Sequence, residues 1–414
     1  SCSAVDCLRL AAAGMMAAAT AAARGLSVVL LEKNATLGKK LAITGGGRCN
    51  VTNNKPVVRE MLASYRKEGK FLFSTFTQHG VAESIKWFAE RGVPFKEENE
   101  GRLFPTTESA ETIRHTLETE VIRTGVTVRC NEAVRSIEYD QTSSCFQVTT
   151  GTGETRARAC IVATGGLARP ETGSTGDGFA WLRELGHTVV PNTNALVPIV
   201  LASRWTAALS GLTLPEVKVT VVADGEKQLT RTGRLLFTHV GLSGPLILNM
   251  SKEIGDLLEH SQVTIYLNVF PQYDAGELKS YLTELLTSNM KLQNALAKAL
   301  PRQLVKAILA ECNLDGEQPC HSVLRENRTT LLNYLQRIPL SVRGLQGAEK
   351  AVISAGGVVL EEVDFKTMES KRVPDLYVVG DLLNINRPSG GYSLQLCWST
   401  GYVAGSQVCA ASEE

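Results

Sequence analysis

The chain has 414 residues, of which 43% are apolar and 21% charged, and its formal net charge is +1. This length exceeds what one hydrophobic core usually organises, so we expect two or three structural units. The composition excludes a disordered or fibrous protein, and the small net charge gives no whole-molecule field that would attract nucleic acid or anionic lipid. Ten cysteines without a Cys-x-x-Cys pair predict neither a metal site nor a disulfide framework, and favour the reducing cytoplasm.

The first thirty residues follow the pattern of a βαβ unit. A strand over 5–10 precedes an alanine-rich helix over 14–24, which Gly25 ends, and a second strand covers 26–31. A crossover of this length makes the two strands parallel, as in a nucleotide-binding fold. The apolar run over 11–23 is too short to span a bilayer, so we expect no membrane segment.

The middle of the chain changes character twice. Helices and short strands are predicted in turn at 59–65, 81–91, 109–124, 126–130, 134–139, 146–149 and 159–163. From about 190, a hairpin around the Asp224-Gly225 turn and a strand at 263–269 are followed by three helical patterns between 276 and 334. The sequence again predicts strands from about 347, with a buried strand at 376–379, and then a helix of small residues from about 393.

The pattern of the first part of the chain returns after a long stretch with a different pattern of strands and helices. This order indicates that a second domain is inserted into the first. We expect a discontinuous nucleotide-binding domain at 1–192 and 343–414, interrupted by a domain at 193–342. The insertion is expected to be β-rich to about 272 and helical from about 273.

The turn after the first predicted strand departs from the usual nucleotide-binding pattern. That pattern is G-x-G-x-x-G, but residues 9–14 retain only the last glycine, Gly14. Taken alone, these residues favour an alanine-rich helix that packs on the sheet and binds nothing. Glu32 stands about twenty residues further on, at a strand end, where a carboxylate can accept both ribose hydroxyls. The alternative for Glu32 is a strand-end charge paired with Lys33.

Three consecutive glycines, Gly45, Gly46 and Gly47, form the most informative stretch. Main chain without side chains costs backbone entropy, and this cost is normally offset only where a flat ring or a phosphate approaches closely. Lys39, Lys40 and Arg48 flank the glycines and supply positive charge for a diphosphate. Asn50 can donate and accept hydrogen bonds at a heterocycle edge. The alternative is a flexible surface loop.

These residues belong to a longer run that resembles a known family. The sequences LLEKN at 30–34 and LGKKLAITGGGRCNVTN at 37–53 are similar to the BaiN-like (YhiN-like) group of FAD-dependent oxidoreductases. Further motifs of that group follow in the same order, namely GRLFP at 101–105, TGSTGDG at 172–178, FTHVGLSGP at 237–245 and GGY at 390–392. The resemblance implies an α/β, Rossmann-like two-dinucleotide-binding-domain FAD fold with an inserted β-barrel-like plus helical domain.

The resemblance also implies where FAD binds. Glu32 would hold the adenosine ribose, Val134 would contact adenine through its backbone, and residues 163–165 would cover the ribityl side. Asp381 would reach the ribityl and phosphate, and residues 391–394 would offer a helix N-terminus to the flavin's pyrimidine edge. The expected cofactor-binding residues are Ala11, Gly14, Glu32, Lys33, Lys40, Thr44, Gly45, Gly46, Gly47, Arg48, Asn50, Val134, Ala163, Thr164, Gly165, Asp177, Gly380, Asp381, Gly391, Tyr392, Ser393 and Leu394.

The chain departs from the family pattern at three places. The first turn, at 11–14, is about two residues short, which puts pyrophosphate binding there in question. Asp381 stands where the family more often has Glu. The loop 384–389 also differs from the usual sequence before the paired glycines, which would reshape the substrate pocket.

Two residues are candidates for catalysis. Cys49 follows the glycine turn, where a thiol could protonate a substrate carbon or exchange electrons with a flavin, or be an inert packing residue. His239 lies in a loop-like segment and could donate a proton or anchor substrate, although a structural histidine is the commoner case. Tyr392 could stack near the flavin, but aromatic residues at helix starts usually serve packing.

The sequence therefore predicts a cytoplasmic FAD-dependent reductase. Hydride would pass from a transiently bound NAD(P)H through the flavin to an activated C=C of a substrate held between the FAD and inserted domains. An oxidase is compatible with the same residues. One alternative, also from the resemblance, is a ribosomal RNA dihydrouridine synthase that would use a basic stripe formed by Lys298, Arg302, Lys306, Arg325 and Arg328. Another is a flavin-less structural or interaction protein that kept the fold and lost the turn.

Overall fold

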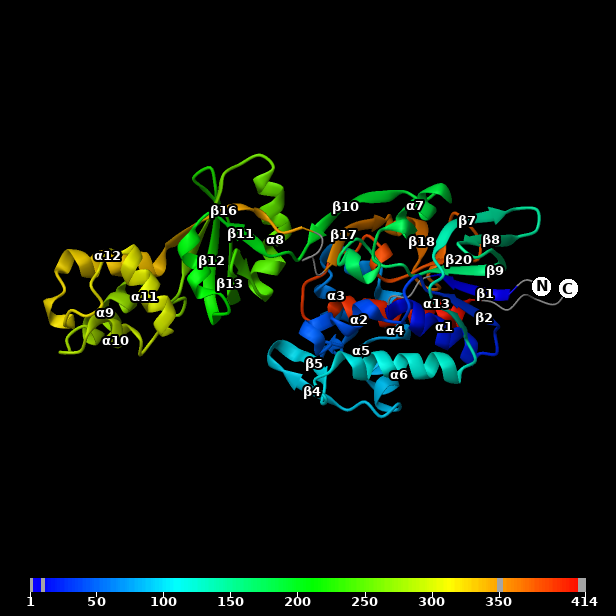
Figure 1. The fold of residues 1–414 in the computed structure, drawn as a ribbon, viewed down its shortest axis with the longest axis horizontal. Coiled ribbons are helices and arrows are strands. Elements are labelled where there is room, and N and C mark those ends of the chain that lie inside the picture. Colours follow the sequence, from blue (N-terminus) through cyan, green and yellow to red (C-terminus); the bar gives the residue numbers. More distant parts are fainter. Residues whose placement is uncertain (1–2, 9–11, 348–352, 409–414) are drawn as a thin grey trace. The chain divides into compact units, whose positions relative to one another are not determined.

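The protein is described by a computed structural model that covers residues 3–8, 12–347 and 353–408. The chain forms two compact units (Figure 1). Unit 1 comprises Ser1–Ala195 and Ala351–Glu414, and unit 2 comprises Leu196–Lys350. One unit is therefore discontinuous in sequence, and the other is a single continuous segment.

Unit 1 is built on a mixed sheet, which has nine strands within the described ranges. The strand order is β18-β19-β20-β9-β1-β2-β6, and β7 and β8 extend from β9. The neighbours β20/β9, β9/β1, β1/β2 and β2/β6 are all parallel. The strands are β1 (Ser3–Leu8), β2 (Val28–Leu31), β6 (Thr127–Arg129), β7 (Val134–Asp140), β8 (Cys145–Thr150), β9 (Glu154–Val162), β18 (Val363–Asp364), β19 (Glu369–Ser370) and β20 (Leu376–Val378).

Helices cover this sheet, and two of them meet through small residues. The helices of unit 1 are α1 (Ala12–Ala23), α2 (Lys39–Ala42), α3 (Val58–Ala63), α4 (Phe73–Gln78), α5 (Val81–Ala89), α6 (Ala110–Arg123), α7 (Asp177–Glu184) and α13 (Tyr392–Gln407). A Cβ on Gly401 would lie 2.3 Å from the carbonyl oxygen of Ala13, and one on Gly405 would lie 2.4 Å from that of Ala17. The small residues therefore let α13 and α1 pack backbone to backbone under the sheet.

Two smaller sheets complete unit 1. The first has the order β3-β5-β4, with β3 (Thr52–Asn53), β4 (Phe95–Glu98) and β5 (Arg102–Pro105). The second pairs β10 (Val189–Ala195) with β17 (Ile353–Val358), so the chain segments that flank unit 2 in sequence lie side by side.

Unit 2 contains a closed barrel in the order β11-β14-β13-β12-β15-β16. Its strands are β11 (Ile199–Leu201), β12 (Thr213–Ala223), β13 (Glu226–Phe237), β14 (Gly241–Ser243), β15 (Val263–Asn268) and β16 (Ile338–Leu345). Along β15 the residues Val263, Ile265 and Leu267 are buried and alternate with half-buried ones, because successive side chains of a strand point to opposite faces. The helices are α8 (Pro245–Leu258), α9 (Ala275–Leu285), α10 (Leu292–Leu296), α11 (Arg302–Glu311) and α12 (Arg325–Gln336).

The predicted α/β class with a β-barrel and helical insertion is confirmed. Several elements differ from the expectation. Helix α8 was not predicted, and the described residues between 275 and 336 form four helices rather than three. The expected domain boundary at 342 falls inside β16, because this strand closes the barrel against β11 and β15.

Candidate cofactor-binding site

The expected site residues gather at the carboxyl ends of the parallel strands of unit 1. Glu32 follows β2, Thr164 follows β9, and Asp381 follows β20. Ligands of open α/β sheets bind at this edge. Ala11 and the rest of the turn 9–11 lie outside the described residues, whereas Gly14 is buried inside α1.

Close glycine packing holds these strand ends together. A Cβ on Gly380 would lie 3.3 Å from the Cβ of Ala13 in α1, so the loop after β20 contacts the start of that helix. A Cβ on Gly178, next to Asp177, would lie 2.1 Å from the Oγ1 of Thr164. The loops that follow β9 and β20 and the first turns of α1 and α7 therefore share one region.

Glu32 is a buried carboxylate with a fixed orientation. It is 1% exposed, and its Oε1 accepts hydrogen bonds from the backbone N (2.7 Å) and the side-chain Nδ2 (2.7 Å) of Asn34. Lys33 donates to Thr175 Oγ1 (2.8 Å) and pairs with Asp177 (3.4 Å). The structure thus brings Lys33 and Asp177, two of the expected cofactor contacts, into one ion pair.

Asp381 lies in a half-buried cluster with two cations. Lys40 Nζ is 3.3 Å from Asp381 Oδ2, and Arg387 Nη2 donates to Asp381 Oδ1. Burial acts to raise the pKa of Asp381, but the charges of Arg387 and Lys40 outweigh it and hold the pKa below its ordinary value. The carboxylate is therefore ionised at neutral pH, and the cluster carries two positive charges against one negative charge.

The glycine turn exposes bare main chain. Residues Thr44–Gly47 form a 3₁₀ turn in which Gly45, Gly46 and Gly47 have φ values of 57°, 70° and 86°. A Cβ on Gly46 or Gly47 would meet nothing within 4 Å, while one on Gly45 would lie 2.9 Å from the backbone N of Asn50. All three glycines are exposed, so a flat ligand can approach the backbone without contacting a side chain.

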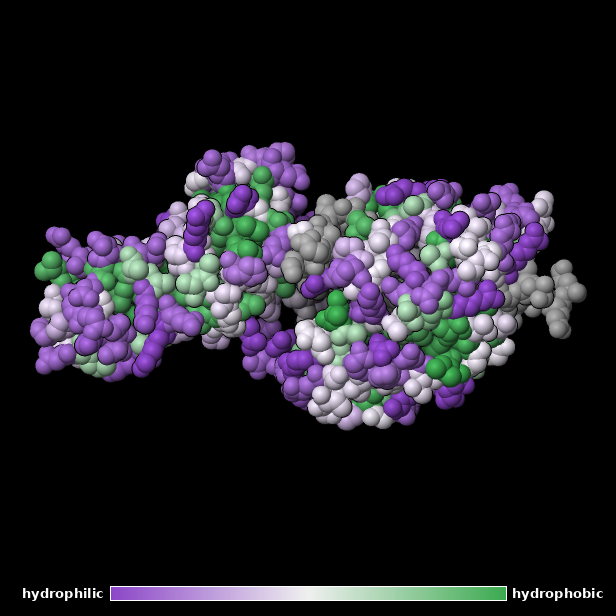
Figure 2. Space-filling view, viewed as in Figure 1, coloured by the Kyte–Doolittle hydropathy of each residue, from purple (hydrophilic) through white to green (hydrophobic). Residues whose placement is uncertain are grey.

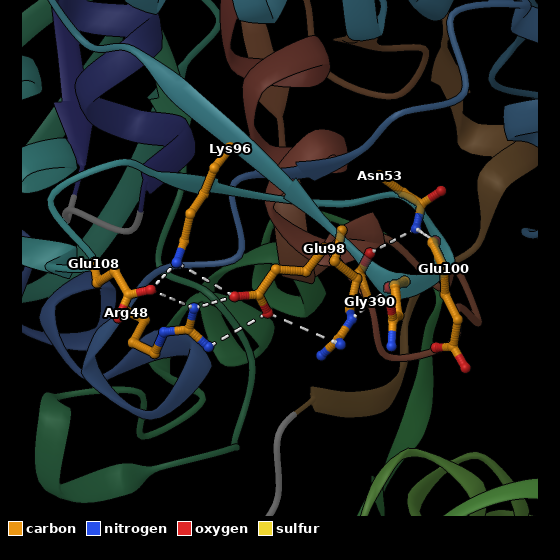
Figure 3. A network of polar contacts seen from close by, with 9 residues as sticks. Arg48, Asn53, Lys96, Glu98, Glu100, Glu108 and Gly390 are labelled. Atoms are coloured by element: carbon orange, nitrogen blue, oxygen red, sulfur yellow. Dashed lines mark hydrogen bonds and ion pairs between the residues drawn. The ribbon is translucent and has the colours of Figure 1, made fainter. Parts of the chain in front are cut away.

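Arg48, expected to face a diphosphate, lies instead in a network of carboxylates (Figure 3). Its guanidinium binds Glu98 and pairs with Glu108 at 3.2 Å, and it stacks on the ring of Phe104 at 4.3 Å from the centroid. Lys96 joins the same two carboxylates. The hydrogen bond from Arg48 lowers the pKa of Glu98, so the network is held by opposite charges and Arg48 is already neutralised.

The paired glycines before α13 are held against the β3 strand. A Cβ on Gly391 would lie 2.3 Å from the carbonyl carbon of Thr52, so only glycine fits, and its φ is 100°. The amide of Asn50, oriented to satisfy both of its groups, accepts from Gly391 N (3.0 Å) and donates to Leu103 O (3.2 Å). Asn53 Nδ2 donates to Gly390 O (3.2 Å), as Figure 3 shows.

Cys49 follows the glycine turn but points into the protein. Its side chain is fully buried, its φ is 59°, and its backbone N donates to Thr44 O (3.0 Å). Burial raises the pKa of the thiol to about 12, against a smaller opposite effect of a hydrogen bond with Thr44. The thiol is therefore neutral at physiological pH.

Comparison with known proteins identifies the family. The sequence pattern described as "HI0933-like protein Rossmann domain" matches residues 10–407. The chain belongs to the HI0933-like family. This membership confirms the resemblance to the BaiN-like (YhiN-like) group and, at the level of the class, the predicted FAD-dependent oxidoreductase.

Two relatives of this HI0933-like protein match along almost the whole chain. The "3-dehydro-bile acid delta(4,6)-reductase" of Clostridium scindens is 28% identical over 394 residues, which are 94% of this chain and 95% of that protein. The "Ribosomal RNA dihydrouridine synthase" of Escherichia coli is 30% identical over 407 residues, which are 97% of this chain and 96% of that protein. Among solved structures, the 3-ketosteroid delta1-dehydrogenase of Sterolibacterium denitrificans matches 97% of this chain and 98% of its own, at 12% identity and a TM-score of 0.54. The structural match supports the fold.

The remaining predicted residues of the HI0933-like protein occupy different settings. Val134 begins β7 opposite Thr150. Tyr392 is buried, and its carbonyl oxygen accepts from Tyr65 OH (2.8 Å), while Leu394 packs against the core. His239 is exposed in the turn between β13 and β14 of unit 2, so it belongs to a different unit from Cys49.

Two contributors were missed at the sequence level. Arg387 is fully buried and contacts Asp381, and Asn53 ties Gly390 to Glu100 O (2.8 Å). The departure of the loop 384–389 from the family pattern was the only sequence signal for Arg387. Within the described ranges, no three His, Cys, Asp or Glu side chains group as a metal site requires, and no helix has the length and apolar character needed to cross a membrane.

The residues present fit the chemistry of FAD. A buried carboxylate at a strand end suits a ribose diol, and a cluster with excess positive charge suits a diphosphate or another anion. Exposed glycine main chain suits a flat ring. The buried Nε of Arg48, next to the glycine turn in sequence, and the buried Oδ1 of Asn53, near Gly101, have no hydrogen-bond partner among the described residues, and a ligand could satisfy them.

Proposed function

We propose that this protein binds FAD at the carboxyl edge of the unit 1 sheet and reduces an activated carbon–carbon double bond of a small-molecule substrate, with NAD(P)H as the transient reductant. The flavin supplies the hydride chemistry. The observation that carries the proposal is the gathering of Glu32, Thr164 and the Asp381 cluster at this edge. The names of both relatives, a delta(4,6)-reductase and a dihydrouridine synthase, describe saturation of such a bond.

The protein's own residues would divide the work of binding. Glu32, fixed by Asn34, is proposed to accept the ribose hydroxyls, and Lys40 is proposed to face the anionic part of the cofactor. The 3₁₀ turn Thr44–Gly47 would offer backbone N–H groups to the ring system. The N-terminus of α13, at residues 391–394, would add the positive end of a 16-residue helix.

Cys49 is proposed as the proton donor to the substrate carbon. Its thiol is neutral, as an acid must be, and Cys49 lies two residues after the last exposed glycine, Gly47. Because the side chain is fully buried, its use requires the turn to move when substrate binds. His239 keeps its proposed role as a proton donor or substrate anchor.

An absorbance scan of the freshly purified protein tests the proposal. We expect the yellow spectrum of bound FAD, which bleaches under anaerobic conditions when NADH or NADPH is added and returns when a small enone is added. A bleached flavin that only oxygen can reoxidise would contradict the reductase and support the oxidase. A colourless protein that takes up no added FAD would support the flavin-less alternative.

Ribosomal RNA dihydrouridine synthesis is the second candidate, favoured by the E. coli relative. Of the expected basic stripe, Lys298, Arg302 and Lys306 are exposed, as is Arg325. Arg328 instead donates to the carbonyl oxygens of Val323 (3.0 Å) and Cys320 (3.2 Å). Figure 2 shows mostly hydrophilic residues over α9–α12 on the visible face, with apolar ones between them.

Salt dependence separates the two substrates. An RNA substrate held through phosphates should lose affinity about 10³-fold or more between about 50 and 200 mM salt if the contacts are many. Turnover of a small neutral enone should change little over the same range. Reduced protein that leaves ribosomal RNA unmodified at low salt would contradict the RNA candidate.

A further inference from the structure

Arg387 is a buried guanidinium that joins two parts of the candidate site. Its side chain is 0% exposed. Nη2 donates to Asp381, Nε donates to Ser393 Oγ (2.9 Å), and Nη1 donates to Ile385 O (2.7 Å). One side chain therefore links the loop after β20 to the first turn of α13.

The surroundings of Arg387 make its burial costly for the stability of the fold, which indicates a role beyond stability. A buried cation requires a matched anion, and a cation at a helix N-terminus faces the positive end of the helix dipole. Asp381 is the only carboxylate among the described residues that pairs with Arg387, and Lys40 shares it at 3.3 Å. Glu68, the next carboxylate, accepts from Asn386 Nδ2 (3.2 Å).

Two other titratable side chains near Arg387, Cys397 and Tyr65, add no negative charge. Burial and, to a smaller extent, the charge of Asp381 raise the pKa of Cys397 to about 12, so this thiol is neutral. Burial also raises the pKa of Tyr65 well above its ordinary value. The cluster of Asp381, Lys40 and Arg387 by itself therefore has an excess of one positive charge, to which the N-terminus of α13 adds.

We propose that Arg387 is a positioning residue that raises the reduction potential of the bound flavin. The inference rests on the proposed function, in which Asp381 and the start of α13 contact FAD. A flavin gains negative charge when it accepts a hydride, so a fixed positive charge stabilises the reduced form more than the oxidised form. Arg387 would supply that charge while its hydrogen bonds hold Asp381 and Ser393 in place.

Reduction potentials of the FAD-loaded full chain test the proposal. We expect Arg387→Gln to weaken binding of reduced FAD at least tenfold relative to oxidised FAD, which lowers the two-electron potential by at least about 30 mV. Arg387→Lys should restore most of the shift, because it keeps the charge. Asp381→Asn should move the potential in the opposite direction, which gives a second measurement if Arg387→Gln folds poorly.

The matched control is Arg372→Gln. Arg372 also pairs with a carboxylate in unit 1, at 2.8 Å from Glu362, but outside the candidate site, so its loss should leave the potential unchanged. An unchanged potential in both Arg387→Gln and Asp381→Asn, with FAD bound, would overturn the role of Arg387 alone. A wild-type protein that binds no FAD would overturn the proposed function and this inference together.

Discussion

At the scale of single residues, burial decides what Cys49 can do. A cysteine acts as a nucleophile through its thiolate, but burial raises the pKa of Cys49 to about 12. Of the roles open to this residue, proton donation agrees with the neutral thiol, and nucleophilic attack does not. Cys49 has a left-handed backbone, with φ 59°, and its side chain is buried two residues after three exposed glycines.

Cys49→Ala should therefore separate the two half-reactions. We expect the rate of substrate reduction to fall about 10²-fold or more, the usual contribution of a positioned acid, while flavin reduction by the nicotinamide is unchanged. Stopped-flow absorbance measures the two steps separately. The control is Cys320→Ala, which removes a buried thiol that belongs to unit 2 and should change neither rate. Equal losses in both half-reactions of Cys49→Ala would argue for a structural role.

His79 provides a residue-scale prediction for pH. Its ring is 3% exposed and stacks on Tyr402, with centroids 4.1 Å apart. Burial lowers the pKa of His79 from 6.5 to about 3, so the unfolded chain takes up a proton between these pH values and the folded chain does not. The free energy of unfolding is unaffected above pH 6.5 and falls as the pH drops towards 3.

His79→Phe keeps the stacked ring and removes the titration. Between about pH 7.5 and about pH 4.5, the wild type should lose about 2–3 kcal/mol more than this variant. Urea denaturation at the two pH values gives the difference. His260→Gln, which changes an exposed histidine, should lose as much stability between the two pH values as the wild type. An equal loss in His79→Phe would refute the assignment of this pH dependence to His79.

At the scale of elements, α1 and α13 form the support of the candidate site. The sequence predicted both as helices of small residues, but their contact depends on Gly401 and Gly405, which lie one helical turn apart. The same pairing places Gly380 against Ala13 and the Sγ of Cys397. Close helix packing thus positions the loop that carries Asp381.

Gly401→Ala tests this packing. Alanine favours a helix over glycine by about 1 kcal/mol, but its Cβ would lie 2.3 Å from a main-chain oxygen, and no rotamer relieves that contact. We expect a net destabilisation of about 1–3 kcal/mol, together with weaker FAD retention. Gly276→Ala in α9 has only an ordinary 3.4 Å contact and should be neutral or stabilising. Thermal unfolding of both variants decides the comparison.

At the scale of the whole molecule, the two units have separate cores. The expected FAD contacts that the structure describes all lie in unit 1, whereas unit 2 has its own barrel and helices. A ligand stabilises only the unit whose folded state binds it. FAD should therefore raise the stability of unit 1 and leave the stability of unit 2 unchanged.

Calorimetry of the full chain with and without FAD should show this inequality. At a free FAD concentration of about 100 times Kd, the unit 1 transition should gain about 2.7 kcal/mol and move to a higher temperature. The transition of unit 2 should stay in place. An equal shift of both transitions, or a single transition that shifts as one, would contradict independent stabilisation of unit 1.

The sequence by itself determined what depends on local chemistry. The fold class was predicted from the βαβ pattern, the alanine-rich helix, the glycine run at 45–47 and the pattern that an insertion interrupts. Motif matches predicted the family. Each of these features involves residues close together in the chain. The boundaries were less exact, because β16 is fixed by barrel closure with β11 and β15 and not by its own composition.

Only the tertiary structure decided which charges meet. Arg48 was expected to face a phosphate but binds Glu98 and Glu108, and Arg387, which was not singled out, reaches Asp381 and Ser393. Long side chains pair with whatever the fold brings near them, and Arg48 and Glu98 are separated by 50 positions in the chain. Burial of the Cys49 thiol likewise depends on neighbours from other elements, so its protonation state followed only from the folded chain.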